Sequence, residues 1–110
     1  AGGEKTKKLI SKSVISSMKK SSYLINVSRG TVIDEKALIN SLKNNKIKGA
    51  ALDVFYNEPK INQIFKKLNN VIIHPHHGSG TVETRNAMAQ LSCQNLINFF
   101  KKGKPLHKVI

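Results

Sequence analysis

Apolar residues in this chain fall into short continuous runs separated by segments with helical spacing. Residues 23–27 ("YLINV") and 49–55 ("GAALDVF") are runs of strand length, and a third run, "NVIIHP", is stopped by Pro75. Continuous apolar runs of this length are typical of strands buried on both faces of a sheet. We therefore predict three buried strands.

The segments between these runs carry signals for helices. In residues 33–45 ("IDEKALINSLKNN"), Asp34 is placed to cap a helix, and Ile33 and Leu38 have the spacing of a hydrophobic staple. Residues 61–68 ("INQIFKKL") place their apolar side chains on one helical face, and residues 11 to about 19 predict another short helix.

A longer helix is expected from Thr81 to about Phe100, ended by the breakers of "KKGKP". Its apolar stripe includes Cys93, which is expected to lie in the core. The resulting order alternates four helices with three strands. This alternation predicts the α/β class, with right-handed crossovers and a parallel sheet.

Polar residues with reactive side chains follow each predicted strand. Arg29 comes after the first, Asp53 ends the second and is followed by Glu58, and the third runs into three histidines within residues 74–77. In open parallel sheets, ligands bind outside the carboxyl ends of the strands. The sequence therefore predicts one site built from three loops.

An arginine, a histidine and a glutamate together suit proton transfer on a small acid with a keto or hydroxyl group. A guanidinium holds a carboxylate with two parallel hydrogen bonds. An imidazole exchanges a proton near neutral pH, and a carboxylate on its far nitrogen fixes the tautomer.

Composition adds little to this picture. The chain has 110 residues, 39% of them hydrophobic, which suits one compact domain without a membrane-spanning run. A single cysteine excludes an internal disulfide and favours the cytoplasm. The net charge of +13 suggests an anionic partner, but only Arg29 and Arg85 are arginines, and no aromatic residues alternate with the lysines. A solvated, lysine-rich surface is therefore favoured over a nucleic-acid interface.

The segments "LINVSRGTVIDEKALINSLKNNKIKGAALDVFYNEP" and "NVIIHPHHGSGTVETR" resemble the D-isomer-specific 2-hydroxyacid dehydrogenases. The resemblance extends from "TKKLIS" to "GKPL", and "GSGTVETR" is most similar to the glyoxylate and hydroxypyruvate reductase branch. It implies the second half of a Rossmann-type, doubly wound NAD(P)-binding domain, hydride transfer between NAD or NADP and a small 2-keto or 2-hydroxy acid, and a homodimer at full length.

The resemblance also implies roles for individual residues. Arg29 would bind the substrate carboxylate, His76 would be the general acid, and Glu58 would orient that histidine. Asp53 would contact the nicotinamide amide. The other positions that match the cofactor-binding residues of the family are Thr6, Val27, Ser28, Gly78 and Ser79, and Arg29 and His76 also lie at the cofactor.

His74 and His77 depart from the pattern of this family and can shift the pKa of His76 by like-charge repulsion. A metal site is the rival interpretation, but H-x-H-H is not a zinc spacing and no nearby cysteine completes it. A phosphate loop at residues 78–80 ("GSG") is rejected because Glu83 replaces the third glycine.

The seven glycines do not form the G-x-G-x-x-G fingerprint of dinucleotide-binding folds. We therefore expect a C-terminal fragment, inactive alone, with residues 1–80 as half of the NAD(P)-binding domain. Residues 81–110 would be a helix and tail returning to an absent substrate domain. The alternatives left open are a basic nucleic-acid-associating module and a non-enzymatic remnant of a dehydrogenase.

Overall fold

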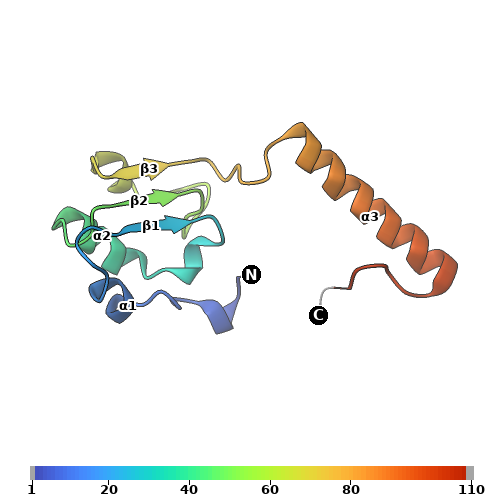
Figure 1. Ribbon diagram of the computed structural model, residues 1–110, viewed down its shortest axis with the longest axis horizontal. Coiled ribbons are helices and arrows are strands. Elements are labelled where there is room, and N and C mark those ends of the chain that lie inside the picture. The colour runs from blue at the N-terminus through green and yellow to red at the C-terminus, as the bar shows by residue number, and fades with distance from the viewer. Residues whose placement is uncertain (1, 109–110) are drawn as a thin grey trace. The chain divides into compact units, whose positions relative to one another are not determined.

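The computed structural model describes residues 2–108, which form two units, one ending at Gly78 and one beginning at Ser79. The first unit holds a three-stranded parallel sheet in the order β1-β2-β3 (Figure 1). The strands are β1 (Tyr23–Asn26), β2 (Gly49–Leu52) and β3 (Val71–Ile73). The helices of this unit are α1 (Lys12–Ser16) and α2 (Glu35–Lys43), and three 3-10 turns, η1 (Glu4–Thr6), η2 (Gly30–Val32) and η3 (Phe65–Lys67), complete it. The predicted α/β class and parallel sheet are confirmed.

The start of α2 forms as its sequence predicts. The carboxylate of Asp34 accepts the backbone N–H of Ala37 at 3.1 Å and caps the helix. Ile33 and Leu38, on either side of the cap, are both buried in the core. The cap and the staple therefore fix where the helix begins and how it faces the sheet.

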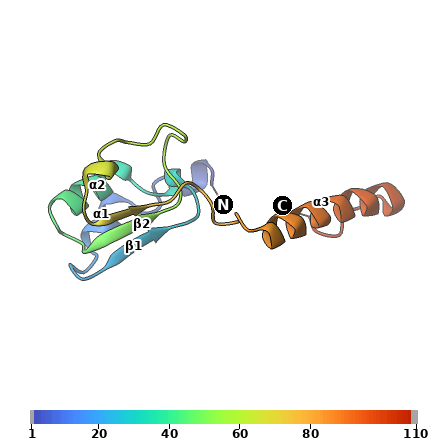
Figure 2. The ribbon, with the colours of Figure 1, turned by 90° about the horizontal axis from the view of Figure 1, so that it is seen from above.

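The core of the first unit lies between the sheet and the helices α1 and α2, which Figure 2 shows on one side of it. Phe65 of η3 is 2% exposed, and its ring packs against Phe55 with centroids 5.9 Å apart. The segment 61–68 thus packs its apolar side chains against the core, with Phe65 buried and Ile61, Ile64 and Leu68 partly buried, but only η3 is helical within it.

The strands are not buried on both faces within the part of the chain that the structure describes. Leu24 and Asn26 of β1 are buried, whereas Tyr23 and Ile25, which alternate with them, are 59% and 70% exposed. Ile72 of β3 is 70% exposed on the same face. The prediction is wrong here because the described helices of this unit cover one face only.

The second unit consists mainly of α3 (Val82–Lys102). Thr81 caps its start by accepting the N–H of Thr84, and Gly103 ends it with a left-handed φ of 70°. No side chain of α3 is buried, and Cys93 is exposed, so its predicted core position is wrong in this structure. Within the described residues of this unit, no second helix or strand packs against the apolar side chains of α3. Within residues 2–108, no helix combines the length and hydropathy needed to cross a lipid bilayer.

Candidate active site

The loop after β1 carries Arg29 and is hydrogen-bonded to the buried side-chain amide of Asn26 at the end of the strand. Asn26, 6% exposed, accepts both the backbone N–H and the hydroxyl of Ser28, at 3.0 and 2.9 Å. Its own amide nitrogen donates to the Arg29 carbonyl at 3.0 Å. The loop is therefore fixed to the end of its strand.

Gly30 lets this loop meet the loop after β2. A Cβ on Gly30 would stand 2.0 Å from the carbonyl carbon of Phe55, which no other residue could tolerate without backbone movement. The glycine thus allows the segment with Arg29 to lie against the segment that leads to Glu58.

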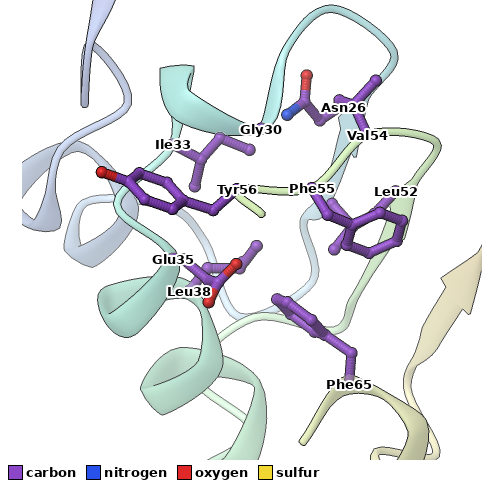
Figure 3. A pocket seen from close by; sticks show the side chains of 10 residues that line it. All are labelled: Asn26, Gly30, Ile33, Glu35, Leu38, Leu52, Val54, Phe55, Tyr56 and Phe65. Carbon is purple, nitrogen blue, oxygen red and sulfur yellow. The ribbon is translucent and has the colours of Figure 1, made fainter. Parts of the chain in front are cut away.

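The space left between these two loops is small. A cavity of about 10 Å³ lies there (Figure 3), enough for about one water molecule. Its walls are mostly apolar side chains of the core, with Asn26, Glu35 and Tyr56 among them. This size excludes it as the binding site of an organic ligand.

Glu58 and His76 form a hydrogen-bonded pair at the carboxyl end of the sheet. His76 Nδ1 lies 2.7 Å from Glu58 Oε2, and the other oxygen of Glu58 accepts the Phe55 N–H, also at 2.7 Å. The hydrogen bond to His76, followed by that from Phe55, holds the pKa of Glu58 below its usual value. The carboxylate is therefore ionised at neutral pH, His76 Nδ1 carries the proton that it donates, and Nε2 is the nitrogen left for chemistry.

The backbone of His76 is in the left-handed region, with φ 58°. Such a conformation costs energy for a non-glycine residue and persists where neighbouring contacts impose it. Here the N–H groups of the next two residues, His77 and Gly78, both bind Asp53. The strained turn is thus held by contacts on its C-terminal side.

Asp53 is the anchor of this loop. Its carboxylate, on a residue 6% exposed, accepts His74 Nδ1 at 2.6 Å and the N–H groups of His77 and Gly78 at 2.8 Å each. The hydrogen bond from His74, with those from the two backbone N–H groups, lowers the pKa of Asp53 from 3.8 to about 2 despite burial. The burial of a charged aspartate at a strand end is thus compensated by three donors.

A larger pocket of about 350 Å³ lies beside the two histidine–carboxylate pairs. His74 and His76 line it together with Glu58 and one cation, Lys66. The remaining lining residues are apolar, namely Phe55, Pro59, Ile61, Ile73 and Pro75. Its volume is in the range of small-molecule sites.

The structure brings several of the predicted residues together. Glu58 and His76 are in direct contact, and the charge of Arg29 contributes a smaller lowering of the pKa of Glu58. Asp53 accepts hydrogen bonds from the loop that carries His76, one of them from the Gly78 N–H. His74 and His76 have separate carboxylate partners, and the ring of His77 packs edge-on against His74 at 5.7 Å.

The remaining predicted cofactor positions are more scattered. Val27 follows β1 and is 69% exposed, and Ser28 is bound to Asn26. Thr6 lies in η1 and donates to the Gly3 carbonyl at 3.2 Å. Ser79 is the first residue of the second unit.

Two residues that support the site, Asn26 and Gly30, do not stand out in the sequence by themselves, and the sequence does not reveal that His74 binds Asp53. For Asn26 the available signal is an amide inside an apolar run, since a buried amide needs partners. Across residues 2–108, histidine, cysteine and acidic side chains form no group of three arranged to hold a metal ion.

Comparison with known proteins identifies the first unit. The sequence model described as "D-isomer specific 2-hydroxyacid dehydrogenase, NAD binding domain" matches residues 2–78. A 2-ketogluconate reductase of Gluconobacter oxydans is 43% identical over 110 residues, which are 100% of this chain and 36% of that protein. A glyoxylate reductase of Pyrococcus furiosus is 46% identical over 101 residues, 92% of this chain and 30% of that protein.

The fold is also similar to solved structures. An NADPH-dependent glyoxylate/hydroxypyruvate reductase from Sinorhizobium meliloti, in complex with NADP and malonate, has a TM-score of 0.93 at 42% identity. The match covers 98% of this chain and 34% of that one. The chain thus spans about a third of the length of these proteins.

Proposed function

The chain belongs to the D-isomer-specific 2-hydroxyacid dehydrogenase family, and on that premise we propose that it supplies the proton-transfer half of a keto-acid reductase site. In this proposal His76 is the general acid, Glu58 orients it, and Arg29 binds the carboxylate of the substrate. The observation that carries the proposal is the 2.7 Å bond between His76 Nδ1 and Glu58 Oε2.

We propose NAD or NADP as the cofactor. NAD(P)H supplies the hydride when it is bound. The residues at the sheet end fit such a group in one respect, because a side chain on Gly78 would begin 3.2 Å from Asp53 Oδ2 and cover it. Asp53 would accept the nicotinamide amide, and Thr6, Val27, Ser28 and Ser79 would line the rest of the cofactor, together with Arg29, His76 and Gly78.

The proton chemistry follows from the tautomer. With Nδ1–H held by the ionised Glu58, a protonated His76 presents Nε2–H to the substrate. As the keto carbon accepts hydride, its oxygen takes this proton and becomes a hydroxyl. The imidazole is left neutral and still donates through Nδ1, so the ring keeps its orientation through the step. The reverse reaction uses the same nitrogen as a base.

The substrate class in this proposal is a small 2-keto or 2-hydroxy acid of the glyoxylate or hydroxypyruvate type. The support is that an arginine, which grips a carboxylate with two hydrogen bonds, is close enough for its charge to act on Glu58. Two of the relatives reported above carry such substrates in their names, one glyoxylate and the other glyoxylate and hydroxypyruvate. The 350 Å³ pocket provides room for a side group on the acid.

The test is His76→Ala in the intact protein that carries this sequence. Keto-acid reduction is expected to slow by about 100-fold or more, the usual scale for losing a general acid. The measurement is the oxidation of NADH or NADPH in the presence of glyoxylate or hydroxypyruvate. His107→Ala is the matched control, since that exposed histidine lies in the second unit. Near-normal turnover of His76→Ala would end the assignment.

We also propose that the intact protein is a homodimer and cytoplasmic. The helix α3 and its tail would connect the NAD(P)-binding domain to a substrate domain. The 110-residue chain by itself would be inactive, because its sequence contains no G-x-G-x-x-G fingerprint for the pyrophosphate.

A further inference from the structure

We propose that His74 is a positioning residue that leaves only one oxygen of Asp53 available to the carboxamide of the cofactor. This inference rests on the proposed function, in which Asp53 faces the nicotinamide. It concerns a residue that forms a second imidazole–carboxylate pair two positions before His76.

The first step is to count the acceptor positions on Asp53. Each carboxylate oxygen accepts about two hydrogen bonds. Oδ1 accepts His74 Nδ1 at 2.6 Å and the His77 N–H at 2.8 Å, so it is filled. Oδ2 accepts the Gly78 N–H at 2.8 Å and, among the residues that the structure describes, nothing else. One acceptor position therefore remains, and it is on Oδ2.

The second step concerns the access to that position. Asp53 is 6% exposed, so an incoming donor can approach only from a narrow direction. A Cβ at position 78 would come within 3.2 Å of Oδ2, and glycine leaves this approach open. An N–H₂ group of a planar carboxamide is a donor of the size that such an opening admits.

The third step concerns what His74 adds. Without its ring, Oδ1 loses a charge-assisted hydrogen bond and gains a free acceptor position inside a nearly buried group, which is costly. The carboxylate can then relieve this cost by turning, and Oδ2 no longer points in one direction. In the wild type, the ring of His77 packs edge-on against the ring of His74, with centroids 5.7 Å apart, and supports the position of the His74 imidazole.

The experiment compares two cofactors in the intact protein. The dissociation constant is measured for NADH and for its 3-acetylpyridine analogue, in which a methyl ketone replaces the carboxamide and removes the N–H donors. Wild type is expected to bind NADH about tenfold more tightly, since one hydrogen bond to a charged group contributes about 1.4 kcal/mol or more. His74→Ala is expected to bring this ratio close to one by weakening NADH alone.

Two variants keep the test specific. His74→Asn places an amide donor where Nδ1–H stands and is expected to retain most of the preference for NADH. His74→Gln places its donor one bond farther out and is expected to lose the preference. His107→Ala, exposed in the second unit, is the control with an unchanged ratio. If His74→Ala does not fold, the contrast between Asn and Gln decides the question.

Equal weakening of both cofactors by His74→Ala would overturn the proposal, because it would show a general structural role. An unchanged ratio in His74→Ala or His74→Gln would overturn it as well. If wild type bound neither cofactor, the proposed function would fail first and this inference with it. That outcome is distinct from a failure at His74, which appears only in the variants.

Discussion

At the scale of single residues, the candidate site consists of two carboxylates that each hold one imidazole through Nδ1. Asp53 holds His74, and Glu58 holds His76. The pairs differ in their surroundings, because Asp53 is nearly buried and also binds two backbone N–H groups, whereas the side chain of Glu58 is 35% exposed. The same kind of hydrogen bond therefore anchors a loop in one case and, in the proposed function, would orient a proton donor in the other.

Replacing Arg29 by lysine separates charge from geometry. Lysine keeps the positive charge but cannot make the forked contact with a carboxylate. We expect the Michaelis constant for the keto acid to rise by about tenfold, the effect of losing one charge-assisted hydrogen bond. Steady-state kinetics on the intact protein measure it, and Arg85→Lys, the same change at the other arginine, is the control. An unchanged constant in Arg29→Lys would remove Arg29 from the site.

The lowered pKa of Asp53 predicts a specific loss of stability in acid. Its folded pKa of about 2 lies below the ordinary 3.8, so its contribution is complete above about pH 4 and is lost as the pH falls toward 2. Urea denaturation of the intact protein at several pH values measures the free energy of unfolding. We expect this free energy to fall more steeply across that window in wild type than in Asp53→Asn. Parallel curves would contradict the prediction.

The sequence pointed to the residues of the candidate site but not to the contacts that support them. Arg29, Asp53, Glu58 and the histidines were found because each follows a strand, and the strands of a parallel sheet end at one edge. The partner of His74 was not found, since 21 positions separate it from Asp53 and no spacing rule links them. Pairings of this kind depend on which strands are neighbours and on the register between them.

At the scale of elements, the cap of α2 offers a test of local stability. Asp34 accepts the Ala37 N–H at 3.1 Å, and this bond, followed by smaller effects of Lys8, holds its pKa below the usual value. Asp34→Ala is expected to lower the free energy of unfolding by about 1 kcal/mol. Ser11→Ala, at the cap of the five-residue α1 with a longer bond of 3.4 Å, is expected to cost less. Urea denaturation of both variants gives the comparison, and equal losses would contradict it.

The element boundaries that were predicted correctly are those with a cap or a breaker. Asp34, Thr81 and Gly103 each mark an end of a helix in the structure. The segment 61–68 has no such marks, and its four apolar side chains pack against the core from an irregular backbone with one 3-10 turn. Apolar spacing alone therefore predicted its burial but not its helix length.

At the scale of the whole molecule, the strands carry more apolar side chains than the described part of the chain buries. Ile25 and Ile72 lie more than two-thirds exposed on one face of the sheet. A hollow of about 500 Å³ is lined by Ile25, Ile72 and other strand residues, together with Lys48, Asn69 and Asn70. The continuous apolar runs predicted that both faces of the sheet are buried. Such runs do not indicate whether the elements that would cover each face belong to these 110 residues.

We expect the 110-residue chain by itself to show no keto-acid-dependent oxidation of NADH, since its sequence has no pyrophosphate fingerprint and one face of its sheet is exposed. The measurement is the nicotinamide absorbance with glyoxylate or hydroxypyruvate present. The intact protein, assayed alongside, is the positive control. Turnover by the chain alone would refute this prediction and would mean that half of the cofactor fold suffices.

The strands stand side by side in the order in which they occur along the chain. The residues of the candidate site follow the strands in the same order: Arg29 comes after β1, Asp53 and Glu58 after β2, and His76 after β3. The imidazole that would perform the proton transfer is thus the last of these groups along the chain. A product truncated before β3 would keep both carboxylates and lose the two histidines that bind them.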